Sequence, residues 1–133
     1  MKIYIGIIIF FLAFSIHAQE TSPPDWFHLE GVSNPDYKVY LDMSNIDYLP
    51  GVSIIVNLKY EYINSETIQT AIHKVKFDVT KDTYDELSKI HIYKSDTSHI
   101  SELTNPRHLI PGSEMSVMYQ SVYIQAVSNY RSK

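Results

Sequence analysis

The alternation of hydrophobic and polar positions is most regular over residues 52–63, which read VSIIVNLKYEYI. Successive side chains of a β-strand point to opposite faces, so every second residue shares one face. One face of this stretch collects the hydrophobic residues Val52, Ile54, Val56, Leu58, Tyr60 and Tyr62. The other face carries Ser53, Asn57, Lys59 and Glu61, interrupted by Ile55 and Ile63. The pattern predicts a long strand with one buried face and one face largely in water.

Weaker alternation on either side extends this prediction to a sheet. Residues 37–43 place Val39 and Leu41 on one face and Lys38, Tyr40 and Asp42 on the other. Residues 70–80 gather a second set of mainly hydrophobic side chains on one face: Ala71, His73, Val75, Phe77 and Val79. Residues 87–94 predict a fourth strand whose buried face the pattern leaves open, and residues 100–103 predict a short fifth strand.

The connections between these strands are short. Residues 42–51 form a connector of about ten residues that ends in the turn-forming pair Pro50 and Gly51, and residues 64–67 form a second turn. Neither connection has room for a crossover helix, so the strands that they join are expected to run antiparallel. Residues 82–86 are polar and predict another turn.

The pattern changes to helical spacing near the C-terminus. Ser113 is a good N-cap because its side-chain oxygen can accept a free backbone N–H of the first turn, and Glu114 suits the positive end of the helix dipole. The hydrophobic residues that then recur three and four apart are Met115, Met118, Tyr119, Val122 and Ala126. The competing interpretation is a strand, because Val117, Tyr119 and Tyr123 also alternate; the cap favours a helix over residues 113–126. The predicted fold class is therefore α+β, an antiparallel sheet of about five strands packed with a C-terminal α-helix.

The first residues have the features of an export signal. Lys2 provides a positive charge, residues 3–16 are almost entirely apolar, and Ala18 offers a small residue at a cleavage site. The competing interpretation is a retained membrane anchor. Such an anchor needs about 20 apolar residues, and Glu20 ends the apolar run too early.

We therefore expect the chain to have three parts: a signal peptide at residues 1–18, a flexible leader at residues 19–25 and a single domain at residues 26–133. The chain has no cysteine. It cannot carry a lipid on an N-terminal cysteine, and it has no disulfide to stabilise it outside the cytoplasm. The sequence predicts an exported protein, periplasmic or extracellular, without a lipid anchor.

The charge balance argues against two classes of partner. The chain has 11 Lys and Arg against 15 Asp and Glu, a net charge of −4 with histidine neutral. Binding to nucleic acid depends on neutralising phosphates with basic residues, and anionic lipid attracts basic segments in the same way. We expect no nucleic-acid partner and no stable membrane insertion once the signal peptide is removed.

Candidate catalytic and metal-binding motifs are weak. His73, His91, His99 and His108 show none of the close paired spacings that are common in zinc sites, so we expect scattered surface or half-buried histidines. Ser113 lies in PGSEM, which does not match the G-x-S-x-G nucleophile turn. The acidic residues of KDTYDEL lack the spacing and the glycine of a calcium loop. The sequence therefore predicts no enzyme, no metal site and no cofactor.

Aromatic residues are the strongest candidates for recognition. Tyrosine has a large apolar ring with a polar tip and suits binding surfaces, although it packs equally well within strands. Tyr37, Tyr40 and Tyr48 are expected to be the most exposed set, near the first connector, and form the candidate partner-binding surface. Trp26, which opens the domain, is expected to close one end of the core rather than to stack on a ligand.

Several short motifs, in this order, resemble the surface-adhesin protein E family of exported bacterial proteins. They are Trp26, VYLDMSNI at residues 39–46, the alternating strand at residues 52–62, KVKFD at residues 74–78 and IPGSEMSVMYQSVY at residues 110–123. The resemblance implies an antiparallel sheet with a C-terminal helix, binding to host matrix or serum proteins, and no catalytic residues. The chain departs from many members of that family in having no cysteine.

Two functions follow as hypotheses. The first is a non-enzymatic, adhesin-like domain of the cell envelope that binds a host or envelope protein through its sheet face or connector loops. The second is a periplasmic protein that binds haem or an apolar small molecule in a groove between sheet and helix, lined by Met115, Met118 and Tyr119.

Overall fold

The computed structural model describes residues 22–95, 98–101 and 106–133. The expected signal peptide, the start of the leader (residues 19–21) and residues 102–103 of the expected fifth strand lie outside these residues. The described elements are β1 (Trp26–His28), η1 (Glu30–Val32, a 3-10 turn), β2 (Tyr37–Asp42), β3 (Asp47–Leu49), β4 (Ser53–Tyr62), β5 (Ile68–Asp78), β6 (Thr83–Tyr93), β7 (Ser98–Ser101), β8 (Arg107–His108) and α2 (Glu114–Arg131).

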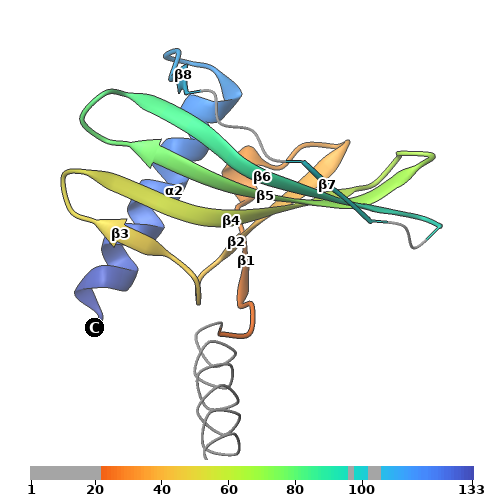
Figure 1. Cartoon of the computed structure of the whole chain (residues 1–133), viewed down its shortest axis with the longest axis horizontal. Helices are drawn as coiled ribbons and strands as arrows, with labels where there is room; N and C mark the ends of the chain where they lie inside the picture. Colours follow the sequence, from red (N-terminus) through yellow and green to blue (C-terminus); the bar gives the residue numbers. More distant parts are fainter. Residues whose placement is uncertain (1–21, 96–97, 102–105) are drawn as a thin grey trace, which may run out of the picture.

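The strands form one antiparallel sheet in the order β1-β2-β4-β5-β6-β7, with β3 paired to β4 and β8 paired to β6. Helix α2 crosses one face of this sheet (Figure 1). The predicted α+β class is confirmed, with an antiparallel sheet and one C-terminal helix. Within the described residues the sheet has eight strands, more than the five or so that were predicted, and four of them are only two to four residues long.

Strand β4 lies at the centre of the sheet, as its alternation predicts. Ile54, Val56 and Leu58 are fully buried beneath α2. They pair with Phe77, Val75 and His73 of β5. The first predicted core position is wrong: Val52 precedes the strand and is 47% exposed. The buried face of β4 therefore begins at Ile54, two residues later than the pattern indicates.

Two stretches that were predicted to be connections contain strands. The connector at residues 42–51 includes β3, which pairs back onto the start of β4. Residues 83–86 of the expected polar turn at 82–86 form the first part of β6 and pair with β5. Pairing with a neighbouring strand overrides the low strand propensity of Asp and Glu, which is how tertiary context commonly acts in sheets.

Helix α2 begins where the cap predicts and ends later than expected. The Ser113 hydroxyl accepts the backbone N–H of Ser116 at 3.3 Å. The buried side chains of the helix are Met118, Val122 and Ala126. The helix continues past Ala126 to Arg131 because the intervening residues include neither glycine nor proline to end it. The competing strand interpretation is wrong. No helix among the described residues has the length and apolar character needed to cross a membrane.

Candidate binding surface

The two faces of the sheet differ in what covers them. Helix α2 and η1 pack on one face, above the buried residues of β2, β4 and β5. Within the described part of the chain no element packs on the opposite face, which we call the open face. The strand register places these side chains at its centre: Trp26, His28, Tyr40, Asn57, Lys59, Ile72, Lys74, Ser88 and Ile90.

A lysine and two aromatic rings form the best-defined unit of the open face. The Lys59 Nζ atom lies 4.7 Å from the centroid of the Trp26 ring and 4.7 Å from that of the Tyr40 ring. The same ammonium group is 3.4 Å from Glu61 Oε1. The ring faces of Trp and Tyr attract a cation by roughly 0.5–2 kcal/mol, depending on how far it is desolvated. Lys59 of β4 therefore contacts and stabilises the positions of Trp26 in β1 and Tyr40 in β2.

Tyr40 has further partners on the same face. Its ring centroid is 5.1 Å from that of His28. Burial raises the pKa of the Tyr40 hydroxyl, and the Glu61 carboxylate, which accepts its hydrogen bond, raises it further. The hydroxyl therefore stays protonated at neutral pH and acts as a hydrogen-bond donor.

A groove of about 270 Å³ crosses the strands beside Trp26. Its floor follows one cross-strand row, from Trp26 and Asp42 through Asn57 and Lys74 to Ser88. Ile72 and Ile90 form one wall, and Ser22, Pro24 and Asn45 lie on the side of the N-terminal segment. The groove thus combines one indole ring and two aliphatic side chains with an amide, an ammonium and a hydroxyl group.

Asp42 fixes the end of this groove. Its side chain is 1% exposed. Oδ1 accepts hydrogen bonds from the backbone N–H groups of Asp25, at 3.0 Å, and Ser44, at 3.1 Å. Oδ2 accepts a hydrogen bond from the side-chain Nδ2 of Asn45 at 2.7 Å. Burial acts to raise the pKa of Asp42, but these hydrogen bonds outweigh it and lower the pKa below its ordinary value. The described part of the expected leader, residues 22–25, is therefore hydrogen-bonded to the domain.

The three tyrosines predicted as one surface do not lie together. Tyr37 and Tyr40 are three residues apart in β2, so they point to opposite faces of the sheet. Tyr48 packs against α2, with ring centroids 6.4 Å from Tyr123 and 5.5 Å from Tyr130. All three are half-buried. Only Tyr40 belongs to the open face.

Tyr37 joins a row of rings on the helix side of the sheet: Tyr62, Tyr37, Tyr60, His73, His91 and Tyr93. The closest pair is Tyr60 and His73, with ring centroids 4.7 Å apart. Burial and the nearby Lys89 lower the pKa of His73 to about 4, against a smaller opposing effect of Glu86. His73 is therefore neutral at neutral pH. No group of His, Cys, Asp and Glu within the described residues is arranged to hold a metal ion.

Trp26 is placed differently from the prediction. It was expected to close one end of the core, but it lies half-buried on the face opposite the core. Its neighbour Phe27 points to the helix side instead. The register of β1 against β2 decides this, because it sets Trp26 opposite Asp42 and Phe27 opposite Leu41. The indole is therefore available to the surface.

A serine–histidine contact near β1 has a structural explanation. His28 Nε2 is 3.0 Å from Ser33 Oγ. The Ser33 hydroxyl donates to the carbonyl of Leu29 at 2.9 Å and accepts the N–H of Val39 at 3.0 Å. Because the hydroxyl proton is already engaged with Leu29, the imidazole acts as a donor to Ser33 and not as a base. This contact holds the turn between β1 and β2.

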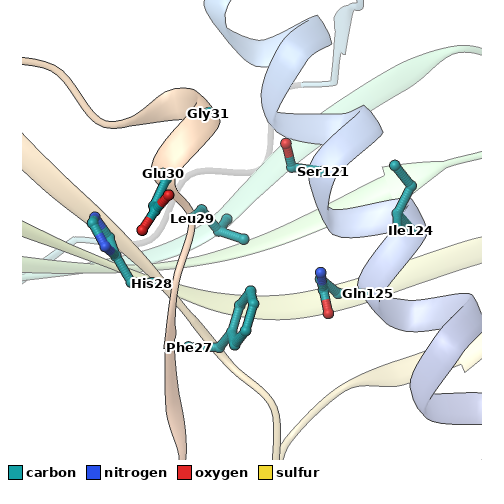
Figure 2. Close-up of a pocket in the computed structure, with 8 residues that line it drawn as sticks. All are labelled: Phe27, His28, Leu29, Glu30, Gly31, Ser121, Ile124 and Gln125. Carbon is teal, nitrogen blue, oxygen red and sulfur yellow. The ribbon is translucent and has the colours of Figure 1, made fainter.

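The helix side has a second hollow, of about 550 Å³, between α2 and the segment of β1 and η1. Figure 2 shows Phe27 and Leu29 on one side of it and Ser121, Ile124 and Gln125 on the helix opposite. The residues proposed to line a ligand groove lie elsewhere. Met118 is fully buried, Met115 and Tyr119 pack against the same core, and the Tyr119 ring contacts Phe77 at 5.3 Å between centroids. These three side chains fill the space between sheet and helix.

Comparison of the chain with models of protein families, with curated proteins and with solved structures found no match. The resemblance to surface-adhesin protein E accordingly remains a prediction from short motifs.

Proposed function

We propose that the chain is a non-enzymatic, exported protein of the bacterial cell envelope that binds another protein through the open face of its sheet. The observation that carries the proposal is the Trp26–Lys59–Tyr40 unit, which lies beside the 270 Å³ groove on a face that no described element covers. Export is supported by the N-terminal sequence, and the envelope by the resemblance to surface-adhesin protein E.

The composition of the open face suits a protein partner. Trp and Tyr dominate the energetics of protein interfaces because each buries a large ring and loses little rotamer freedom. Lys59 already holds Trp26 and Tyr40 in place. Binding of a partner therefore costs less side-chain entropy than it would if the two rings were mobile before binding. Asn57 and Ser88 supply donors and acceptors along the groove.

The chemistry of the face favours binding over catalysis. Asp42, which is fully buried, has its oxygens engaged by the N-terminal segment and its own turn. Asp85 in β6 has one buried oxygen without a hydrogen-bond partner among the described residues, but it does not line the groove. The serine and histidine that lie within hydrogen-bond distance, Ser33 and His28, are engaged in a turn. A catalytic base or nucleophile needs an unengaged group at the surface of a cleft.

The test uses intact cells and matched variants. Protease accessibility first shows on which side of the outer membrane the protein lies. Cross-linking then identifies the bound protein, and its purified form is titrated against the domain. Trp26 is the single tryptophan of the chain, so its fluorescence reports binding directly. Binding should shift the Trp26 emission and saturate.

The control separates the open face from the rest of the surface. Tyr40→Ala removes a ring from the open face, whereas Tyr48→Ala removes one from the helix side. We expect Tyr40→Ala to weaken binding by roughly tenfold or more, as is usual for an aromatic hot spot, and Tyr48→Ala to have little effect. Equal effects of the two variants would contradict the proposal.

A further inference from the structure

Helix α2 carries apolar side chains on two opposite faces. Its inner face is buried in the core. Its outer face carries Val117, Gln120, Ile124, Val127 and Arg131, which we call the outer stripe. Val117 is 38% exposed and Ile124 is 63% exposed. A surface helix normally pairs one apolar stripe with a polar face, so the outer stripe has the composition of a second contact surface.

The spacing of the outer stripe suits another helix. Its members follow one another at intervals of three and four residues. This is the spacing at which two helices pack along a common seam. The small side chains of Ser121 and Ser128 flank the stripe. They allow a second backbone to approach closely.

The surface on either side of Ile124 is hollowed. The 550 Å³ hollow shown in Figure 2 lies between Ile124 and Phe27. A second hollow, of about 370 Å³, lies along Ile124, Val127 and Ser128 on the helix. In a pair of copies related by a twofold axis, the protruding Ile124 of each copy can enter a hollow of the other. The surface is therefore complementary to a second copy of itself.

The charges of α2 select the direction of pairing. Its charged residues are Glu114 at the first position and Arg131 at the last. In an antiparallel pair, the Glu114 end of one helix lies beside the Arg131 end of the other. The positive end of each helix dipole then also lies beside the negative end of the other, which is favourable. In a parallel pair, like charges would face each other. The charge pattern is therefore complementary to a second, antiparallel copy.

We propose that two copies of this chain associate through the outer stripes of α2, packed antiparallel about a twofold axis near Ile124. Because α2 lies on the side of the sheet opposite the open face, the dimer directs two open faces outward. A bivalent arrangement of this kind increases avidity for a partner that is present in many copies. The dimer itself does not depend on the proposed function.

The first test is the mass of the purified protein in solution, measured by sedimentation over a wide range of concentration. We expect a monomer–dimer equilibrium. Ile124→Glu should weaken the dimer by roughly tenfold or more, because a charge then enters the seam. Ile63→Glu is the matched control, since Ile63 is 52% exposed but lies after β4, away from α2. A monomer at every concentration, or equal effects of the two variants, would overturn the proposal.

The second test exploits the absence of cysteine. In Ile124→Cys the two copies bring their only thiols together at the axis, and a mild added oxidant converts the two thiols to one disulfide, accepting two electrons. We expect a covalent dimer from Ile124→Cys and none from Ile63→Cys under the same conditions. Cross-linking of both variants to the same extent, or of neither, would contradict the proposed seam.

The third test addresses direction. Glu114→Lys and Arg131→Glu should each weaken the dimer by a few fold, because each places like charges together at the ends of the seam. The double variant restores opposite charges and should recover the affinity of the parent protein. A double variant that is no tighter than the single variants would refute the antiparallel arrangement.

Discussion

The Lys59 ammonium group is equidistant from the rings of Trp26 and Tyr40, at 4.7 Å from each centroid. The three residues come from β4, β1 and β2, and they meet only because the register of these strands places them on one face. This unit both stabilises the edge of the sheet and presents its aromatic rings to the surroundings.

Replacing Lys59 by Met tests the contribution of the cation. The aliphatic part of the side chain is retained, but both cation–π contacts and the ion pair with Glu61 are lost. We expect the free energy of unfolding to fall by about 1 kcal/mol, measured by urea denaturation with Trp26 fluorescence. Lys38→Met, an exposed lysine of β2, is the control and should change stability little. The interpretation is wrong if both variants behave alike.

Asp42 should be a main determinant of stability at the N-terminal edge. Asp42→Ala removes the acceptor of several hydrogen bonds and leaves the N–H of Asp25 without its partner. We expect a loss of about 2–4 kcal/mol, measured by urea denaturation at neutral pH. Asp47→Ala, at an exposed carboxylate in β3, should cost little. A small effect of Asp42→Ala would show that residues 22–25 are held by other contacts.

The same carboxylate gives a pH dependence with a definite sign. Because the folded protein holds the pKa of Asp42 below its ordinary value, its contribution to stability is present above that value and is lost as pH falls through the folded pKa. Thermal denaturation across the acidic range should show this loss in the parent protein. Asp42→Asn should show a flatter profile, and an unchanged profile would contradict the assignment.

His73 adds a second pH dependence at milder acidity. Its folded pKa of about 4 lies below the ordinary value of 6.5, so the unfolded chain takes up a proton first. Stability should therefore be unaffected above about pH 6.5 and should decline by up to about 3 kcal/mol as pH falls towards 4. Lys89, Glu86 and His91 are the charged or titratable groups that act on it. His73→Phe should reduce this decline, and NMR titration of the His73 ring measures the pKa directly. An ordinary titration of His73 would refute the prediction.

The packing of α2 against the sheet depends on Met118. This side chain is fully buried between α2 and the sheet. Met118→Ala should leave a cavity and lower the free energy of unfolding by about 2–5 kcal/mol. Ile63→Ala removes an exposed side chain and should cost well under 1 kcal/mol. If Met118→Ala proved equally mild, the packing of α2 described above would be incorrect.

The sequence predicts the parts of the fold that depend on local pattern. The alternation of β4 identifies Ile54, Val56 and Leu58 as core, and Ser113 identifies the start of α2. Both are decided within a few residues of the chain. A cap or a period-two pattern needs no knowledge of the neighbouring elements.

What the sequence does not predict depends on pairing between distant residues. Every residue of β6 is half-buried, so its pattern shows no difference between the two faces of the strand, and its polar start predicts a turn. Trp26 and Lys59 are far apart in the chain, and only the register through β2 brings them together. For the same reason closeness in sequence predicts one surface for Tyr37, Tyr40 and Tyr48, although the structure separates them. The face of each strand follows from alternation, but its neighbours follow from register.

The most direct measurement places a photo-activated cross-linking side chain on each face of the sheet in turn, in cells that produce the protein. Ile90, at the groove of the open face, and Tyr48, against α2, are the two positions. The proposed function predicts a discrete cross-linked product with a second protein from position 90 and not from position 48. A product from position 48 alone, or from neither position, would contradict the assignment of the open face as the binding surface.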